Sequence, residues 1–564
     1  MSITAMAATA MVERLTQTGS PFEIVEVQVG GQRLRAYRNA PATLPELIDA
    51  ARAHGAKEYM AYQGERWSYD RFFAAVDALA GRLQAQVNIR PGDRIAIAMR
   101  NRPEWAVAFF AAALVGALPV PLNSFGTGSE LRAAIASVAP RVLFCDGERL
   151  QRLEPELAAL GCHVVVAGAP NDESRGLLGF DAVSSPGGPA RQPVTVQPDD
   201  PALLLFTSGA SARPKAVQSS HRAVCQAVFN IDFIGALSGM TSPAAVATLM
   251  ARALAPTTLT VVPLFHVSGL HAQLLTTLRN GRRLVFMHRW EPAQALRMIQ
   301  DEKITQFNGA PSMVQQLMGV PGFDPSSTAR TLGGVGFGGA GLSQRLVQAV
   351  LGLFPNSMSG IGFGLTETNG AVSAISGSLF EAKPHSSGPL SPLTEVRIVG
   401  LDGHTLPAGQ SGEIWVRGVT VMQQYWGQPE ATAQVLQDGW FRTGDIGYLD
   451  DEGFLFVVDR IKDVINRSGE KIAAAEVESC LSELPDVEEA AVIALPDAVT
   501  GEAVVAVVVP RPGATLEPEQ VQAHVAARLA SYKVPSRVVI RDERMPRNPA
   551  GKLLKGELKA KYAN

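Results

Sequence analysis

The sequence predicts an α/β fold with a large N-terminal domain and a small α+β C-terminal domain. Between about residue 40 and residue 360, short apolar runs alternate with amphipathic stretches, a pattern typical of parallel sheets with helices on both faces. After about residue 385, short strand-like runs are separated by Asp-Gly turns, which indicates a small β-rich subdomain. We place the boundary at residues 459–462, between an N-terminal domain of residues 1–458 and a C-terminal domain of residues 463–564.

The individual elements follow from the same patterns. Continuous apolar runs predict buried strands, and the run at 203–206 is interpreted as one strand of a parallel sheet. The strands expected up to residue 360 are 94–99, 141–145, 163–167, 203–206, 258–264, 283–287, 305–309 and 331–337, with helices at 104–116, 150–160 and 343–353. The elements expected after residue 385 are strands 396–399, 412–417 and 453–458, then helices 474–484 and 518–529 with strands 490–494, 503–509 and 538–541.

Length and composition indicate a well-buried globular protein of more than one core, since 564 residues include 46% hydrophobic and 18% charged ones. A net charge of −3 gives no electrostatic reason to expect a nucleic acid partner. Cys145, Cys162, Cys225 and Cys480 follow no disulfide or metal-binding spacing. The N-terminus lacks a signal-peptide pattern, and two prolines interrupt the richest apolar run, residues 105–122. We therefore expect a cytoplasmic protein without a transmembrane segment.

The first candidate site is a strand-like run that ends in a polar loop. Residues 203–215 read LLLFTSGASARPK, so small and hydroxylated residues lie between the apolar run and Lys215. Hydroxyls, unobstructed backbone N–H groups and a lysine are suited to holding a polyphosphate. The spacing differs from that of the common P-loop. The alternative at this stage is an ordinary polar turn after a core strand.

The second candidate is the glycine-rich segment GIGFGLTETNG, residues 360–370. Its glycines would let a planar ring lie against the backbone beside Phe363. Thr366 and Glu367 would supply ligands for phosphate and metal, since a carboxylate beside phosphate oxygens suits Mg²⁺. The alternative is a glycine-rich turn into a helix that Thr366 caps.

Two further segments carry polar residues near turns. Asp445 lies in a Thr-Gly-Asp turn and Arg460 ends a strand, an arrangement that could hold the two hydroxyls of a ribose. In RNPAGKLLK, Asn548, Pro549 and Gly551 predict a turn from which Lys552 projects. The alternatives are a hairpin turn with a surface arginine, and a solvated lysine.

Two other patterns point elsewhere but are incomplete. Gly336, Gly338 and Gly341 match GxGxxG, but no acidic residue follows about 20 positions later, so we reject a dinucleotide site. His266 and His271 are five positions apart with no third ligand nearby, which argues against a metal site.

In order and spacing, these segments resemble the motifs of the adenylate-forming superfamily, which includes acyl-CoA synthetases, adenylation domains and luciferases. FTSGASARPKAV is similar to its phosphate-binding signature, and GFGLTE to its aromatic-Gly-x-Thr-Glu motif. WFRTGD and DRIKDVINRSGEKI are similar to its ribose and hinge motifs, and NPAGKLLK to the motif around its catalytic lysine. The resemblance runs from about residue 45 to the C-terminus. It implies two α/β subdomains and a β-barrel-like subdomain in the N-terminal domain, followed by a mobile C-terminal domain.

The resemblance implies a two-step reaction with ATP, Mg²⁺ and CoA. A carboxylate attacks the α-phosphorus of MgATP to give acyl-AMP and pyrophosphate, and the thiol of CoA then displaces AMP to form a thioester. Two alternatives stay open: a stand-alone ligase that loads a separate carrier protein, and a non-catalytic nucleotide-binding relative. The sequence leaves the oligomeric state open and is compatible with a homodimer.

The resemblance also implies roles for individual residues. Lys552, Thr366 and Glu367 would be catalytic, and Glu367 would also bind Mg²⁺. Lys462 would be the hinge about which the small domain rotates, and Gly469 would line the CoA tunnel. The residues implied to bind ATP or AMP are Thr207, Ser208, Gly209, Lys215, Gly338, Gly339, Ala340, Phe363, Asp445 and Arg460. The residues implied to line the acyl pocket are His266, Phe307, Gly309, Gly336, Gly362 and Leu365.

The chain departs from the superfamily pattern in its phosphate loop, where Ala210, Ala212 and Ala216 replace Thr, Gly and Gly. This puts ATP affinity or loop closure in doubt rather than the reaction class. The acyl-pocket walls are glycine-rich and nearly uncharged, and Phe265 and His266 lack the neighbouring aspartate of relatives that activate amino acids. We therefore expect a medium- or long-chain fatty acid, or a cyclic or aryl acid. The alternative is that these glycines serve only backbone packing.

Overall fold

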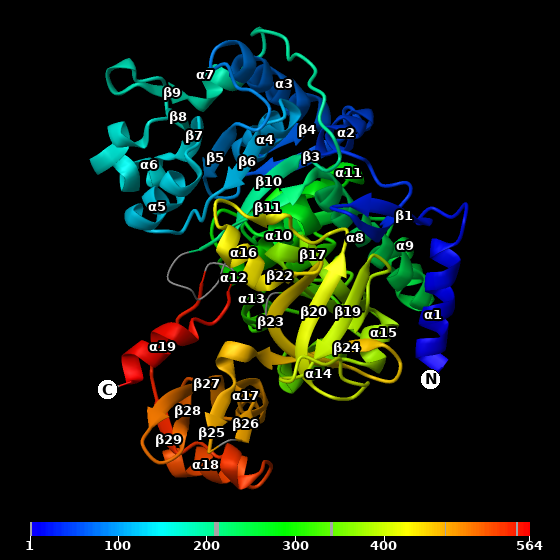
Figure 1. Ribbon diagram of the computed structural model, residues 1–564, viewed down its shortest axis with the longest axis vertical. Helices are drawn as coiled ribbons and strands as arrows, with labels where there is room; N and C mark the ends of the chain where they lie inside the picture. Colours follow the sequence, from blue (N-terminus) through cyan, green and yellow to red (C-terminus); the bar gives the residue numbers. More distant parts are fainter. Residues whose placement is uncertain (1–2, 208–213, 339–341, 469, 549–550, 564) are drawn as a thin grey trace.

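The computed structural model describes residues 3–207, 214–338, 342–468, 470–548 and 551–563. Figure 1 shows a large body that contains the N-terminal sheets and a smaller lobe formed by the last hundred residues. The predicted fold class is confirmed: an α/β N-terminal domain with a β-rich subdomain, followed by an α+β C-terminal domain.

Within the described residues, the largest sheet has eight strands in the order β17-β16-β15-β14-β12-β13-β3-β4. Its inner strands are parallel, and β17 and β4 at the two edges are antiparallel to their neighbours. The bounds of these strands are β3 Glu58–Tyr62, β4 Glu65–Ser68, β12 Thr257–Thr260, β13 Arg283–Phe286, β14 Gln306–Gly309, β15 Val335–Phe337, β16 Gly360–Leu365 and β17 Gly370–Ser376. Ligands bind beyond the carboxyl ends of the strands in such sheets, so the loops after β14, β15 and β16 are the first place to look for a site.

A second, fully parallel sheet has the order β6-β5-β7-β8-β9 in the part of the chain described. Its strands are β5 Arg94–Ala98, β6 Leu118–Pro121, β7 Val142–Asp146, β8 His163–Ala167 and β9 Leu177–Gly179. Helix α4 (Pro103–Leu114) is buried along its whole length and packs on α3 (Tyr69–Ala85). Their aromatic side chains belong to a hydrophobic cluster that joins the two sheets into one body.

The strand expected at residues 203–206 is present as β10 (Pro201–Phe206), but its expected parallel pairing is wrong. It pairs antiparallel with β11 (Ala216–Ser220), which in turn pairs antiparallel with the short strand β21 (Gln424–Tyr425). A continuous apolar run reports burial on both faces of a strand, and here burial comes without parallel neighbours. The polar segment of the first candidate site therefore connects two antiparallel strands, and its residues 208–213 lie outside the described residues.

The β-rich subdomain forms a sheet in the order β18-β24-β23-β20-β19, with β22 beside β23. Its strands are β18 Gly388–Pro389, β19 Thr394–Val399, β20 Gly412–Gly418, β22 Leu436–Gln437, β23 Trp440–Leu449 and β24 Phe454–Arg460. Asp445, expected in a turn, instead lies inside β23, where the register against β20 shifts between Glu413 and Trp415. Gly444 has a φ of +71°, so a bulged strand and not a hairpin turn presents the carboxylate.

The C-terminal lobe combines the sheet β26-β25-β28-β27, with β29 parallel to β28, and three helices. The bounds are β25 Ile465–Arg467, β26 Glu470–Ile472, β27 Val487–Asp497, β28 Gly501–Pro510, β29 Arg537–Ile540, α17 Ala474–Ser482, α18 Pro518–Ala526 and α19 Lys555–Tyr562. Figure 1 shows this lobe beside the end of the molecule that carries α14 (Gln344–Leu353) and β24.

Two helices differ from expectation. The helix expected at 150–160 is α6 (Gly147–Leu153) followed by a 3₁₀ turn, Glu154–Leu160. Helix α8 (His221–Thr241), which the sequence patterns did not single out, is long and apolar enough to cross a membrane by length and composition. It is the only such helix in the described residues, and 61% of its most apolar window is buried inside the protein, as in a core helix.

Candidate functional site

Glycines gather where β14 and β15 end beside the first residue of β16. Gly336 pairs with Asn308 on one side and with Gly360 on the other, and Gly309 pairs with Phe337. A Cβ on Gly336 would lie 2.1 Å from Asn308 Oδ1, so a larger residue would require the Asn308 side chain to move. Gly309 and Gly336, both expected to line an acyl pocket, therefore leave the backbone of the sheet without side chains at its carboxyl edge. We call this surface the glycine wall.

The side chains expected near this wall lie at different depths. Phe307 is fully buried and stacks on Trp290 with ring centroids 5.5 Å apart, so its ring belongs to the core behind the wall. Leu365 and Phe363 are half-buried and pack against hydrophobic clusters of the β-rich subdomain region. Gly362 lies opposite Ala374 in the β16–β17 pair. Their roles toward an acyl group or adenine stay predictions.

Glu367 lies on a tight 3₁₀ turn, Thr366–Thr368, between β16 and β17. The turn is closed by the Thr368 hydroxyl, which donates to the carbonyls of Leu365 and Gly370. A Cβ on Gly364 would lie 1.8 Å from the Gly370 carbonyl oxygen, so this position also requires glycine. The turn holds Thr366 and Glu367 at the carboxyl end of β16, beyond the row in which Gly336 pairs with Gly360.

The ends of the β10–β11 hairpin loop meet next to this turn. The Thr207 N–H donates to the Lys215 carbonyl at 2.9 Å, and the Lys215 N–H donates to the Thr207 hydroxyl at 3.2 Å. Lys215 Nζ lies 4.6 Å from the ring centroid of Tyr425, and the Tyr425 hydroxyl donates to Glu367 Oε1 at 2.8 Å. The lysine of the first candidate segment and the glutamate of the second are thus joined through one tyrosine.

Sequence reasoning missed Tyr425, because no local pattern marks a residue whose partners lie 58 and 210 positions away. In the chain it stands in an unremarkable polar stretch, MQQYW. Its short strand, β21, places it against Val217 of β11. Burial raises the pKa of Glu367, and the hydrogen bond from Tyr425 partly opposes that increase. Burial and the nearby Glu367 charge raise the pKa of Tyr425, so its hydroxyl remains a donor.

Asp445 and Arg460 are direct cross-strand partners on β23 and β24. Arg460 Nε lies 3.0 Å from Asp445 Oδ1, and the Asp445 side chain is only 5% exposed. Among the described residues, Asp445 Oδ2 has no hydrogen-bond partner although it is buried. Burial raises the pKa of Asp445 against the opposing charges of Arg460 and Lys552. A buried carboxylate with one oxygen unused is a candidate acceptor for ligand hydroxyls.

Lys552 reaches this pair from the C-terminal lobe, so the alternative of a solvated terminal lysine is wrong. Burial lowers the pKa of Lys552 to about 7, helped by repulsion from Arg460 and opposed by Asp445. A Cβ on the neighbouring Gly551 would lie 2.5 Å from Ala310 Cβ, at the first residues after β14. Gly551 therefore lies against the carboxyl end of β14, and Lys552 is close enough to Asp445 and Arg460 to interact with their charges.

The lysine loop is itself fastened to the C-terminal sheet. The Arg547 guanidinium donates to the Gly551 carbonyl at 3.0 Å and pairs with Glu489 of β27 at 3.0 Å. The predicted turn is present, since the Asn548 N–H donates to the Lys552 carbonyl. Met545 and Leu553 pack into a hydrophobic cluster with β27 and β28. The position of Lys552 is therefore fixed relative to this lobe.

The two histidines of the weak metal pattern are neutral near pH 7. Burial lowers the pKa of both His266 and His271 to about 4. His266 Nε2 and both ring nitrogens of His271 are buried without hydrogen-bond partners among the described residues. In that part of the chain, no group of three or more His, Cys, Asp or Glu residues could hold a metal ion. A metal bound by protein side chains alone is thus not found there.

Several expected site residues cannot be placed. Ser208, Gly209, Gly339, Ala340 and Gly469 lie outside the described residues. Gly338 is half-buried at the end of β15, and Lys462 is exposed in the 3₁₀ turn Ile461–Asp463 that follows Arg460.

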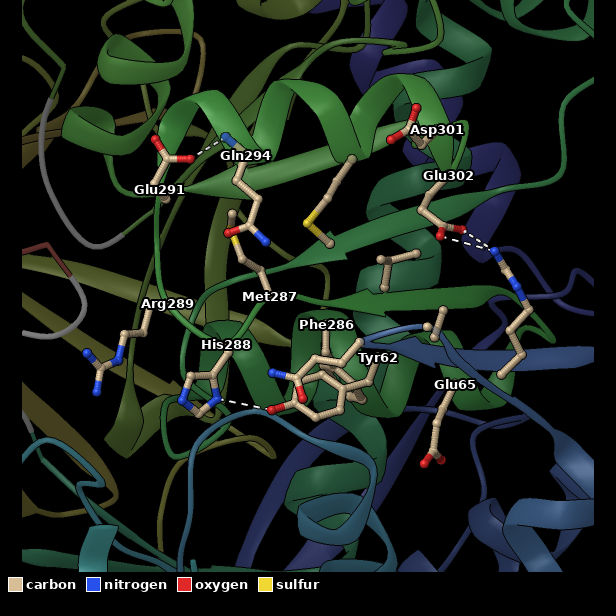
Figure 2. A pocket seen from close by; sticks show the side chains of 16 residues that line it. Tyr62, Glu65, Phe286, Met287, His288, Arg289, Glu291, Gln294, Asp301 and Glu302 are labelled. Carbon is tan, nitrogen blue, oxygen red and sulfur yellow. Dashed lines mark hydrogen bonds and ion pairs between the residues drawn. The ribbon is translucent and has the colours of Figure 1, made fainter. Parts of the chain in front are cut away.

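One cavity lies away from this site. It encloses about 430 Å³ between α12 (Pro292–Asp301) and the β3–β4 hairpin, and none of the predicted site residues lines it. Figure 2 shows Tyr62 and His288 facing each other at one end of this cavity and Glu302 at the other. The candidate site is therefore defined by its converging polar groups and not by cavity size.

Comparison with known proteins identifies the family of this chain. Residues 47–426 match the family described as AMP-binding enzyme, and residues 476–552 match the AMP-binding enzyme C-terminal domain. A feruloyl-CoA synthase from an Amycolatopsis species is 35% identical over 507 residues, covering 88% of this chain and 94% of the relative. An indoleacetate–CoA ligase from Aromatoleum aromaticum is 34% identical over 500 residues, covering 87% of this chain and 92% of the relative. ATP-bound MatB from Rhodopseudomonas palustris shares the fold with a TM-score of 0.80 at 26% identity, covering 92% of this chain and 99% of MatB. The chain belongs to the AMP-binding enzyme family, within the adenylate-forming superfamily.

Proposed function

We propose that this enzyme, an AMP-forming acid–thiol ligase, converts a bulky apolar carboxylic acid first to its acyl-adenylate and then to its CoA thioester. The observation that carries the proposal is the position of Lys552 beside the Asp445–Arg460 pair, on the edge of the large sheet. A cation there can face both a carboxylate and the α-phosphate of a nucleotide whose ribose lies against Asp445. The relatives named as CoA ligases support CoA as the acceptor.

The chemistry assigns each group a task. An oxygen of the acid attacks the α-phosphorus, the bond to the bridging oxygen breaks, and pyrophosphate leaves with its electron pair. Lys552 stabilises the negative charge that builds on the carboxylate and α-phosphate oxygens, as a preorganised charge does in phosphoryl transfer. The CoA thiol loses its proton and attacks the acyl carbon, and AMP leaves. Lys215 and Thr207 would hold the departing pyrophosphate.

Mg²⁺ fits this site as a companion of ATP. Mg²⁺ commonly uses one or two protein carboxylates together with substrate phosphates and water. Glu367 supplies one carboxylate, and no cluster of metal ligands is found in the described part of the chain. Glu367, with the hydroxyl of Thr366 beside it, would hold a cation that neutralises phosphate charge. The protein groups alone would not retain it.

The acid is proposed to be aromatic. Glycines at the wall carry no side chain that would exclude a planar group, and His266, also expected to line the acyl pocket, is uncharged because burial lowers its pKa to about 4. Two relatives are named for feruloyl and indoleacetate substrates, both aryl acids. An aliphatic acid of medium or long chain remains the second class to test, because the wall itself carries no group that selects a ring.

The domain roles are part of the same proposal. Residues 459–462 would form the hinge, with the exposed Lys462 as its hinge residue, and the lobe from residue 463 would turn between the two half-reactions. Gly469 would then line the path of the CoA arm. A reducing cytoplasm suits the four free cysteines.

The test measures acid-dependent pyrophosphate release over a panel of aryl, aliphatic and amino acids, with and without CoA. An aryl acid should give the highest kcat/KM, with thioester formed only when CoA is present. Acetate or a free amino acid as the best substrate would overturn the acid class, and no acid-dependent release would overturn the reaction. Lys552→Ala should lose adenylation by about 100- to 1,000-fold but still convert supplied acyl-adenylate to thioester. Equal loss of both steps would contradict the rotating lobe.

A further inference from the structure

One buried tyrosine lies between the two groups assigned to phosphate and metal. Tyr425 is 4% exposed, and its hydroxyl and its ring face different charged partners. The hydroxyl donates to Glu367 Oε1 at 2.8 Å, and the ring lies under Lys215 Nζ, 4.6 Å from the centroid. Among the described residues, Tyr425 is the side chain that hydrogen-bonds the Glu367 carboxylate.

The backbone around Tyr425 is tied to both candidate segments. β21 pairs with β11 at Val217, and the Trp426 N–H donates to the Ala216 carbonyl at 2.8 Å. Three residues before Tyr425, the Met422 N–H donates to the Glu367 carbonyl at 2.7 Å. The Tyr425 N–H donates to the Thr432 hydroxyl at 3.0 Å. These hydrogen bonds fix the backbone of Tyr425 relative to both candidate segments. Its side chain therefore contacts Glu367 and Lys215 from one position.

We propose that Tyr425 is a positioning residue, which couples the orientation of Glu367 to the position of Lys215. This inference rests on the proposed function, in which Glu367 faces Mg²⁺ and Lys215 faces the terminal phosphates. By holding Oε1, Tyr425 turns Oε2 toward the incoming cation. By presenting its ring face, Tyr425 holds the Lys215 ammonium and leaves its charge in place. A carboxylate partner would instead neutralise that charge. The phosphate lysine and the metal carboxylate are thus set before ATP binds.

Two substitutions separate the two contacts. Tyr425→Phe keeps the ring and removes the hydroxyl, so it should raise the Mg²⁺ concentration for half-maximal adenylation by about 10- to 100-fold, the effect of one hydrogen bond to a charged group. Its affinity for ATP without metal should stay within about twofold of wild type. Tyr425→Leu removes both contacts and should weaken metal-free ATP binding as well, by about two- to tenfold.

The measurements combine activity with equilibrium binding. Pyrophosphate release is titrated with Mg²⁺, and ATP binding is measured by calorimetry with and without Mg²⁺. Tyr62→Phe is the matched control, because it removes one tyrosine hydrogen bond, to His288 at 3.1 Å, in the remote cavity (Figure 2). It should match wild type in both measurements. Thermal unfolding of each variant shows whether the fold is retained.

A double substitution decides whether Tyr425 acts through Glu367. In a Glu367→Gln background, Tyr425→Phe should cause no further change in Mg²⁺ dependence, because the carboxylate it orients is gone. Additive effects would overturn the coupling, and so would a Tyr425→Phe variant with wild-type Mg²⁺ dependence. A wild-type protein with no acid-dependent pyrophosphate release would instead contradict the proposed function, while the metal dependence of ATP binding would still test Tyr425.

Discussion

The charge of Lys552 should make adenylation fall as pH rises above neutrality. The pKa of this lysine is about 7 in the free enzyme, because burial and the charges of Arg460 and Lys462 disfavour the ammonium more than Asp445 and Asp463 favour it. The ammonium form is the one that can stabilise negative charge at the α-phosphate. We therefore expect kcat/KM for ATP, which reports the free enzyme, to follow the protonated fraction.

The size of the effect follows from that pKa. With a pKa of about 7, roughly 91% of the lysine is protonated at pH 6 and about 9% at pH 8, so kcat/KM should fall by about tenfold. Bound ATP adds negative charge beside the ammonium and favours it. The profile of kcat at saturating ATP should therefore shift to higher pH.

The assay is pyrophosphate release at subsaturating ATP from pH 6 to pH 9. Lys552→Arg is the informative variant, because arginine stays charged over this range, so its profile should be flat at whatever rate it retains. Lys561→Arg, on the 57% exposed side chain of Lys561, is the control and should keep the wild-type slope. A wild-type profile that is flat between pH 6 and pH 9 would refute the reasoning, as would the same decline in Lys552→Arg.

Stability should move the other way. Between the folded pKa of about 7 and the ordinary value of 10.5, the unfolded chain binds the lysine proton and the folded protein does not. The contribution of Lys552 to the free energy of unfolding therefore rises with pH in that window. Comparing urea unfolding of wild type and Lys552→Met at pH 7 and pH 9 isolates this contribution, and an advantage of wild type that shrinks at pH 9 would contradict it.

Two further substitutions test the site geometry. Asp445→Asn breaks the ion pair with Arg460, whose side chain is 32% exposed, and should raise the KM for ATP by about tenfold or more through loss of charged hydrogen bonds; an unchanged KM in steady-state kinetics would remove Asp445 from the nucleotide site. Gly364→Ala would place a Cβ 1.8 Å from the Gly370 carbonyl oxygen and should lower the free energy of unfolding by about 1–3 kcal/mol. Gly352→Ala on α14, where a Cβ meets nothing within 4 Å, should instead raise it by about 0.5–1 kcal/mol; similar urea midpoints for the two variants would argue against the packing at Gly364.

The sequence predicted where the strands lie better than which strands pair with each other. β8 is present with the bounds expected, because a run of β-branched valines favours a strand. For β10 the same kind of run predicted the strand but not its antiparallel partner, since hydrophobicity reports burial and not direction. Helix α8 was missed because it is apolar on most faces, so no amphipathic period marks it.

The site was predictable where a role depends on a local motif. Asp445 and Arg460 were expected together, and they are an ion pair on adjacent strands. The bulge that presents Asp445 was not foreseen, because it depends on how β23 pairs with β20. Tyr425 and the burial of Lys552 were beyond reach for a related reason: each depends on segments that meet only in the folded chain.

The anchoring of the lysine loop by Arg547 has a mechanical consequence. If the lobe turns as proposed, Lys552 would move with it, because Arg547 pairs with Glu489 and because Met545 and Leu553 pack on the lobe's strands. A rotation near residue 460 would then displace Lys552 together with the lobe. The position of the Lys552 ammonium relative to the substrate would accordingly depend on the hinge at residues 459–462 and not on the residues around Lys552. Removing the Arg547–Glu489 pair would make the position of Lys552 less well defined without changing the hinge residues.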